Sequence, residues 1–141
     1  MYMLRVSFVA HGHKNIVGKH NSTLELTTEN QLTRRGTCIV GVDAELALSD
    51  LSSDIKSAVK SSETVIELRM TVEGHTETVI GHGAQGLTYD DSTSMVARTS
   101  NYQCDRTLMV SANKAASNLN RAFITKLQNP NSLLRCVLTF K

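Results

Sequence analysis

The feature that most constrains the fold of this chain is the recurrence of short segments in which apolar and polar residues alternate. Apolar residues occupy every second position from Tyr2 to Ala10 and again from Ile66 to Val72. A period of two places alternate side chains on opposite faces of a β-strand, with one face buried. Similar strand signals occur in five further segments, around residues 24–26, 38–40, 79–80, 108–110 and 134–140. Glu73-Gly74-His75-Thr76 predicts a hairpin turn, from which the chain returns through Val79 and Ile80.

Two helices are predicted between these strands. The first covers residues 51–61, where apolar residues recur at fourfold spacing. The second covers residues 114–128, with Asn113 as its N-cap and Pro130 beyond its end. No internal repeat is evident. We therefore expect residues 1–141 to form a single domain with a mainly β fold, on the border of α+β. It would be an antiparallel, jelly-roll-like β-sandwich or a barrel with two α-helices.

Composition excludes several classes of protein. Hydrophobic residues make up 40% of the 141 residues and charged residues 20%, which argues against disorder. No apolar run is long enough to span a bilayer, and the N-terminus does not resemble a signal peptide. The three cysteines are widely spaced, which is typical of a reducing compartment. We expect a cytoplasmic protein that does not enter a membrane.

Two short motifs suggest enzymes that the surrounding sequence does not support. Residues 81–86 match GxGxxG, but turn-forming residues follow them where a dinucleotide-binding fold requires a helix. Residues 111–114 match SxxK, but the partner motifs SDN and KTG are missing. We interpret the first motif as a glycine-rich turn and the second as a chance match.

Anion binding and metal binding are the two kinds of site that the polar residues indicate. Residues 103–141 contain six basic residues and one acidic residue, which suits an anionic partner. Lys114 opens the second predicted helix, where an ammonium and free helix amides would favour an anion. His11 and His13 share one face of a strand end with His20 nearby, which is a spacing that metal sites use.

Several segments together resemble a known family. They are Gly12-His13-Lys14-Asn15-Ile16, His20 followed by Ser22-Thr23-Leu24-Glu25, Leu32-Thr33-Arg34-Arg35-Gly36-Thr37-Cys38-Ile39, Gly81-x-Gly83 with Leu87-Thr88, and Cys104-Asp105-Arg106-Thr107-Leu108 with Lys114-Ala115-Ala116. In the same order and over nearly the whole chain, they resemble the archaeal domain-of-unknown-function family 371. The resemblance implies an archaeal cytoplasmic protein with a jelly-roll-like sandwich, and it supplies no activity.

The family pattern also ranks the candidate residues. His13, His20, Glu25, Arg106 and Lys114 fall on its motif positions, whereas His11 and Ser111 fall where the pattern leaves the residue open. Thr37 stands where the pattern has an acidic residue. The resemblance thus favours the first five as ligand-binding residues and weakens a metal site that uses His11.

Three functions follow as hypotheses. The first is the binding or processing of a small anionic, phosphate-bearing ligand by His13, His20, Arg106 and Lys114, with Glu25 orienting them. The second is a metal-dependent enzyme that uses His13 and His20. The third is an RNA- or protein-binding module that uses the basic C-terminal third. Nucleic acid is the less favoured partner because the chain has no tryptophan and few aromatic residues. The residues specify no cofactor, no oligomeric state and no particular reaction.

Overall fold

The computed structural model describes residues 3–141 and confirms a mainly β fold with two helices. Tyr2, the first residue of the predicted N-terminal strand, lies outside the described residues. Sheet A is antiparallel throughout and has the order β1 (Leu4–His11), β8 (Leu133–Phe140), β4 (Val65–Val72), β5 (His75–His82). Sheet B has the order β3 (Ile39–Gly41), β2 (Thr23–Thr27), β6 (Ser94–Arg98), β7 (Thr107–Met109).

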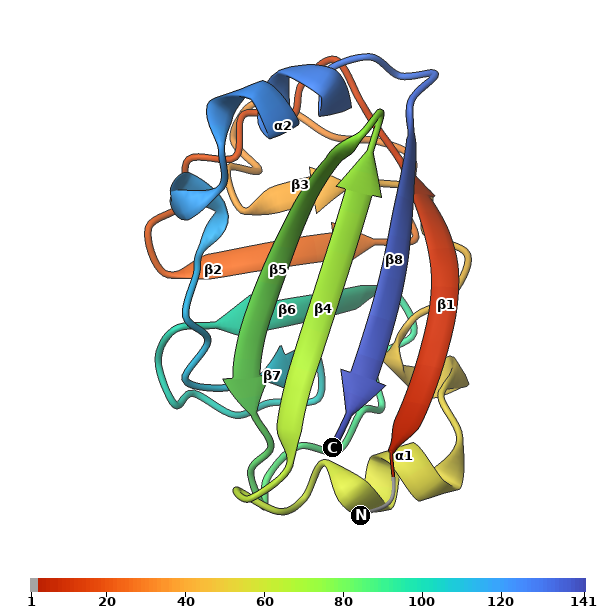
Figure 1. Cartoon of the computed structure of the whole chain (residues 1–141), viewed down its shortest axis with the longest axis vertical. Helices are drawn as coiled ribbons and strands as arrows, with labels where there is room; N and C mark the ends of the chain where they lie inside the picture. The colour runs from red at the N-terminus through yellow and green to blue at the C-terminus, as the bar shows by residue number, and fades with distance from the viewer. Residues whose placement is uncertain (1–2) are drawn as a thin grey trace.

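The two sheets pack face to face, and their strands cross in the view of Figure 1. The apolar half of each alternating segment forms one hydrophobic core between them, which includes Leu24, Leu68 and Leu138. The β2–β3 and β6–β7 pairs are parallel, so sheet B lacks the wholly antiparallel pairing of a jelly roll. In the described part of the chain, residues 3–141, the sheet edges meet only at single bridges, His11 with Val42 and His82 with Val110, and no closed barrel forms.

The predicted hairpin between β4 and β5 forms, whereas the second predicted helix is interrupted. Glu73 and Gly74 both adopt positive φ, of 45° and 82°, and form the two-residue hairpin between β4 and β5 that the sequence predicts. The second predicted helix is divided into a 3₁₀ turn, η2 (Ala116–Asn118), and a helix, α2 (Arg121–Leu127). Asn120 has an extended backbone and caps α2 in place of Asn113, because its side chain accepts the N–H of Ala122.

The prediction that the chain lacks an internal repeat is wrong. A unit of three strands, a 3₁₀ turn, a helix and a strand occurs twice. The first copy is β1, β2, β3, η1 (Leu48–Asp50), α1 (Ser53–Ala58) and β4, and the second is β5, β6, β7, η2, α2 and β8. Both sheet orders read the same after the two units are exchanged. The fold is therefore a duplication with approximate two-fold symmetry.

Equivalent residues in the two units make the same backbone contacts. His11 and His82 form the two edge bridges, and Asp43 and Ser111 adopt φ of 51° and 52°. The numbering difference is 71 at His11/His82 and 68 at Asp43/Ser111, so the second unit is three residues shorter between these positions. Few residues are identical between the units, which is why the repeat is not evident in the sequence.

The His-Gly pair that ends β1 recurs at the end of β5, and in both places glycine is required for packing. A Cβ on Gly12 would lie 2.3 Å from the carbonyl oxygens of Leu127 and Asn129, and one on Gly83 would lie 2.3 Å from that of Val59. Real Cβ atoms do not approach carbonyl oxygens so closely. Gly83 belongs to the GxGxxG match, so this motif serves a close backbone approach.

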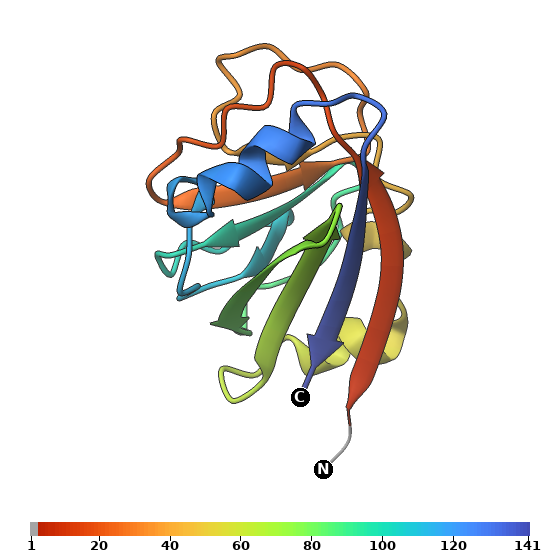
Figure 2. The same ribbon diagram turned by 45° about the horizontal axis from the view of Figure 1, so that its top comes forward.

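The helices lie at the two ends of the structure and leave the outer face of sheet A uncovered. Figure 1 shows α2 at one end and α1 at the other, with β5, β4, β8 and β1 in front. The turned view of Figure 2 shows α2 beside sheet B, away from the outer face of sheet A. The outward side chains of these strands therefore form an open surface.

Candidate functional site

His13 lies in the loop after β1, against the end of α2. Its backbone N–H donates to the carbonyl of Leu127 at 2.9 Å, and its Nδ1 accepts the N–H of Asn15 at 3.0 Å. The Asn15 side chain then donates to the carbonyl of Leu32 at 2.8 Å. The half-buried imidazole thus holds the loop in shape.

His20 shapes a loop in the same way. Its Nδ1 accepts the backbone N–H groups of Ser22 at 3.2 Å and of Thr23 at 3.1 Å. Asp91 is the equivalent residue of the second unit, and its carboxylate accepts backbone N–H groups two and three residues further along. Because a histidine and an aspartate make the same contacts in the two units, the contacts of His20 are those of a turn-forming residue.

Lys114 is held in an ion pair. Its Nζ lies 2.7 Å from the carboxylate of Glu77 on β5, and the two side chains are 32% and 11% exposed. Glu77 also accepts the backbone N–H of Asn120 at the start of α2. The equivalent residues of the first unit are Val6 and Leu46, both partly buried against the core. The pair therefore occupies a site that is apolar in the other unit.

Opposing effects act on the carboxyl group of Glu77. Burial raises its pKa, whereas the hydrogen bond from Asn120 and the ion pair with Lys114 lower it, and the net pKa is below the ordinary value. The charge of Lys114 is thus paired with a carboxylate of the protein itself.

Glu25 and Arg106 both belong to sheet B. Glu25 lies on the outer face of β2, where the thiol of Cys38 donates to it at 3.5 Å. Burial and the neighbouring carboxylate raise the pKa of Cys38 to about 11. Arg106 is exposed just before β7, and its carbonyl accepts the N–H of Val96, the residue opposite Glu25. Within residues 3–141, no hydrogen bond or ion pair joins any two of the five predicted side chains.

A cluster around Arg98 lies on the same sheet and was not predicted. The Arg98 guanidinium donates to Thr107 at 2.8 Å and to the sulfur of Cys104 at 3.5 Å. Its carbon lies 4.9 Å from the centre of the Tyr102 ring. Burial raises the pKa of Cys104, but the hydrogen bonds from Thr107 and the backbone and the nearby Arg98 outweigh it, so the net pKa is lowered.

The second unpredicted feature is a hollow of about 350 Å³ on the outer face of sheet A. Its floor consists of the short side chains of Ser7, Val137 and Thr139. Longer side chains from β1 and β4, and from the residues just before β1 and just after β8, rise around it: Met3, Arg5, Glu67, Arg69 and Lys141. Strand register explains the arrangement, because Arg5 and Glu67 both pair with Thr139 on the central strand β8, and Ser7 and Arg69 both pair with Val137.

The hollow has an excess of positive charge. Lys141 lies 3.3 Å from Glu67, so one cation is paired with the single carboxylate of the lining. Within residues 3–141, the side chain of Arg5 makes one hydrogen bond, to the sulfur of Met3 at 3.7 Å. Among residues 3–141, neither Arg5 nor Arg69 forms an ion pair. Two exposed guanidinium groups thus border the hollow with their charge uncompensated.

Two findings bear on the other sequence hypotheses. Within residues 3–141, no group of three or more histidine, cysteine, aspartate or glutamate side chains is placed to hold a metal ion. In the same part of the chain, no helix has the length and apolar character needed to cross a membrane.

Comparison with known proteins identifies relatives of this chain. The family model described as "Domain of unknown function (DUF371)" matches residues 8–141. The chain belongs to the DUF371 family. Its sequence is also 42% identical over 125 residues to Uncharacterized protein MJ0206 of Methanocaldococcus jannaschii, covering 89% of this chain and 92% of the relative. The resemblance predicted from the sequence is confirmed, and it extends to an archaeal relative.

The DUF371 match contains most of the features described above. It includes the second unit of the duplication and the first from residue 8 onward, the Arg98 cluster, and Arg69 and Lys141 of the hollow. It begins at residue 8, within β1, so Arg5 and Ser7 lie before the matched region. Neither the DUF371 description nor the relative's name states an activity, and the function has to be argued from the geometry.

Proposed function

We propose that this protein binds a small anionic, phosphate-bearing ligand in the hollow on the outer face of sheet A. The observation that carries the proposal is the placement of Arg5 and Arg69 on opposite sides of β8, with no carboxylate of residues 3–141 paired to either. A planar guanidinium presents parallel N–H donors that match phosphate oxygens. Two such groups facing one hollow suit an anion better than any other class of ligand.

The dimensions of the hollow agree with this ligand class. Arg5 and Arg69 lie two strands and two residues apart, which places their backbones roughly 12 Å apart across β8. Long arginine side chains can close this distance over a short floor, and the hydroxyl of Ser7 adds a hydrogen-bonding group at the floor. A hollow of about 350 Å³ lies at the lower end of the range for small-molecule sites.

A titration with inorganic phosphate tests the proposal. The arginine Nε–Hε signals in NMR spectra of the labelled protein report each guanidinium separately. We expect those of Arg5 and Arg69 to shift with phosphate, and the shifts at one to weaken when the other is replaced by glutamine. Arg34→Gln is the matched control, because Arg34 is exposed in a loop. Equal shifts at Arg34 and at the hollow would contradict a site.

The five residues predicted from the sequence have a smaller part in this proposal. His13, His20 and Lys114 make the structural contacts described above, and Arg106 and Glu25 lie on the other sheet. Of the basic C-terminal third, Lys141 borders the hollow. The proposal therefore has the same ligand class as the sequence hypothesis, but it assigns the binding to different residues.

A second candidate function rests on Cys104. Reactive cysteines lie in partly exposed, electropositive surroundings that favour the thiolate, and Cys104 is half-buried beside Arg98. We propose that its thiolate acts as a nucleophile towards electrophilic compounds. Alkylation by iodoacetamide tests this, because Cys38 and Cys136 in the same chain have raised pKa values. Faster alkylation of Cys104 near neutral pH is expected, and equal rates would contradict the proposal.

We also propose a cytoplasmic location. All three cysteines are free thiols, which suits a reducing compartment. Fractionation of cells that express a tagged chain tests the location, with the soluble fraction expected to retain the protein.

A further inference from the structure

We infer that the ligand of the sheet A face is the backbone of a single-stranded nucleic acid, which occupies the hollow and a second, symmetry-related subsite. The inference rests on the proposed function, since the hollow must bind one phosphate for the second subsite to bind the next.

The two-fold relation passes between the central strands of sheet A. Arg69 on β4 and Val137 on β8 are paired in the ladder, and each is the equivalent of the other in the duplication. The positions that line the hollow over β8 therefore have an image over β4. These positions are occupied there by Arg69, Thr71, Glu73, Gly74, Thr76, Thr78, Arg135 and Val137.

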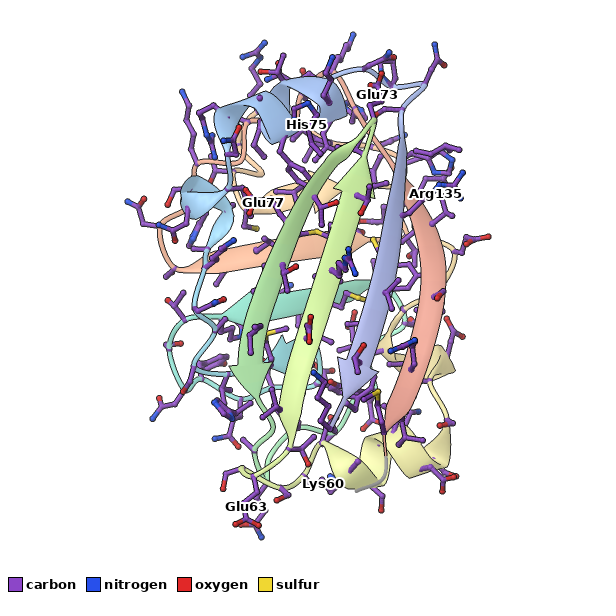
Figure 3. The ribbon with its side chains drawn as sticks, viewed as in Figure 1. Lys60, Glu63, Glu73, His75, Glu77 and Arg135 are labelled. Carbon is purple, nitrogen blue, oxygen red and sulfur yellow. The ribbon has the colours of Figure 1, made fainter. Side chains whose placement is uncertain are left out.

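The image has the chemistry of an anion subsite. Arg135 takes the place of Glu67, so a cation replaces the carboxylate of the hollow. Arg135 is exposed and has no ion pair within residues 3–141. The hydroxyls of Thr71 and Thr76 lie 3.0 Å apart on its floor. Glu73 stands where the hollow has Lys141, and Figure 3 shows it at the hairpin turn, at the end of the strands. We call this image the second subsite.

Arg69 borders both subsites, so the two are continuous. The centre of the hollow lies over residues 137–139 of β8, and that of the second subsite lies over residues 69–71 of β4. In the β4–β8 register, these centres are one strand and two residues apart. Strand geometry makes this roughly 8 Å. That separation is close to the distance between successive phosphates of an extended nucleic-acid strand and far exceeds the distance within a pyrophosphate.

The surrounding face favours contact with the backbone of the nucleic acid. It is open along the strands in Figure 1, so a chain can enter and leave. Within residues 3–141, the outward side chains of sheet A include no phenylalanine, tyrosine or tryptophan, and the outward histidines, His11 and His82, stand at the ends of the two edge strands. Bases therefore have no phenylalanine, tyrosine or tryptophan on which to stack here, and binding should depend on phosphate charge and hardly on sequence.

Fluorescence anisotropy with a labelled 12-nucleotide oligouridylate tests the inference. We expect Arg135→Gln to weaken its binding at least tenfold at low salt and to leave inorganic phosphate binding in the hollow unchanged. Lys126→Gln removes the same charge from an exposed position on α2 and should change the affinity less than twofold. The wild-type salt dependence should have a slope of about −1.4, for two phosphates at roughly −0.7 each.

The outcomes separate this inference from the proposed function. If phosphate shifts Arg5 and Arg69 but Arg135→Gln and Lys126→Gln bind the oligonucleotide equally, the second subsite is refuted and the hollow stands. The same holds if uridine monophosphate binds as tightly as the 12-mer. If inorganic polyphosphate binds and the oligonucleotide does not, nucleic acid is refuted as the ligand. If phosphate produces no shift in the hollow, the proposed function fails first.

Discussion

Replacing Lys114 by methionine should destabilise the protein by about 2 kcal/mol at neutral pH. The change removes the partner of Glu77, whose side chain is only 11% exposed, and leaves a largely buried carboxylate without its cation. Losing one partner of a fully buried pair costs about 3–5 kcal/mol, whereas exposed pairs contribute about 1 kcal/mol or less. Lys114 is 32% exposed, and Glu77 keeps the hydrogen bond from Asn120, so an intermediate value is expected.

The pH dependence of this loss has a definite sign. The pKa of Glu77 in the folded protein is below its ordinary value of 4.5, so the group stabilises the fold above pH 4.5. This contribution is lost as the pH falls through the folded pKa. Without Lys114, burial still raises this pKa, and the ion pair no longer lowers it. The stability difference between wild type and Lys114→Met should therefore be largest near pH 7 and shrink below about pH 4.5.

Thermal and urea unfolding at pH 7 and pH 4 measure both effects. A loss of about 2 kcal/mol lowers the melting temperature by roughly 5–10 °C for a chain of this size. Lys126→Met is the matched control and should change the stability by less than about 0.5 kcal/mol. The double variant with Glu77→Val and Lys114→Leu reproduces Val6 and Leu46 of the first unit and should recover most of the loss. A single variant as stable as the control would refute the structural role of the pair.

Three further predictions follow from the fold and the thiols. Arg98→Gln should slow alkylation of Cys104 near pH 7 severalfold, because the thiolate loses its cation; an unchanged rate-versus-pH profile would exclude the role of Arg98. Gly12→Ala should lower the free energy of unfolding by more than about 3 kcal/mol, because its Cβ meets backbone carbonyls. Gly36→Ala should lower it less, because its Cβ meets first the flexible end of a leucine side chain. Comparable urea midpoints for the two variants would contradict this. Residues 1–73 alone should not form a folded monomer, because β8 separates β1 from β4 in sheet A; a cooperative monomeric unfolding transition of this fragment would be inconsistent with one interlocked domain.

Local patterns predicted the parts of the fold that depend on near neighbours. The alternation from Ile66 to Val72 and the Glu73-Gly74 turn specify the β4–β5 hairpin within 18 residues. The helix predicted over 114–128 was too long, because its apolar spacing continues through the break at Asn120, where the extended backbone and the capping side chain end one turn and start the next.

The duplication and the candidate site depend on pairing between distant strands. β2 and β3 pair in parallel across a long loop, and the two units share few identical residues, so neither feature has a local signal. Arg5 and Arg69 border the same hollow only because β8, from the end of the chain, lies between β1 and β4. Each of these arginines stands at a polar position of an alternating segment. That signal marks them as outward-facing, but strand order was needed to bring them together.

A crystal of the protein soaked in tungstate tests the central claim most directly, because tungstate mimics phosphate and scatters anomalously. The account predicts an anomalous peak in the hollow between the guanidinium groups of Arg5 and Arg69, and its loss in the Arg5→Gln, Arg69→Gln double variant. Peaks only at other positions, or a peak in the hollow that persists in the double variant, would contradict anion binding by these residues.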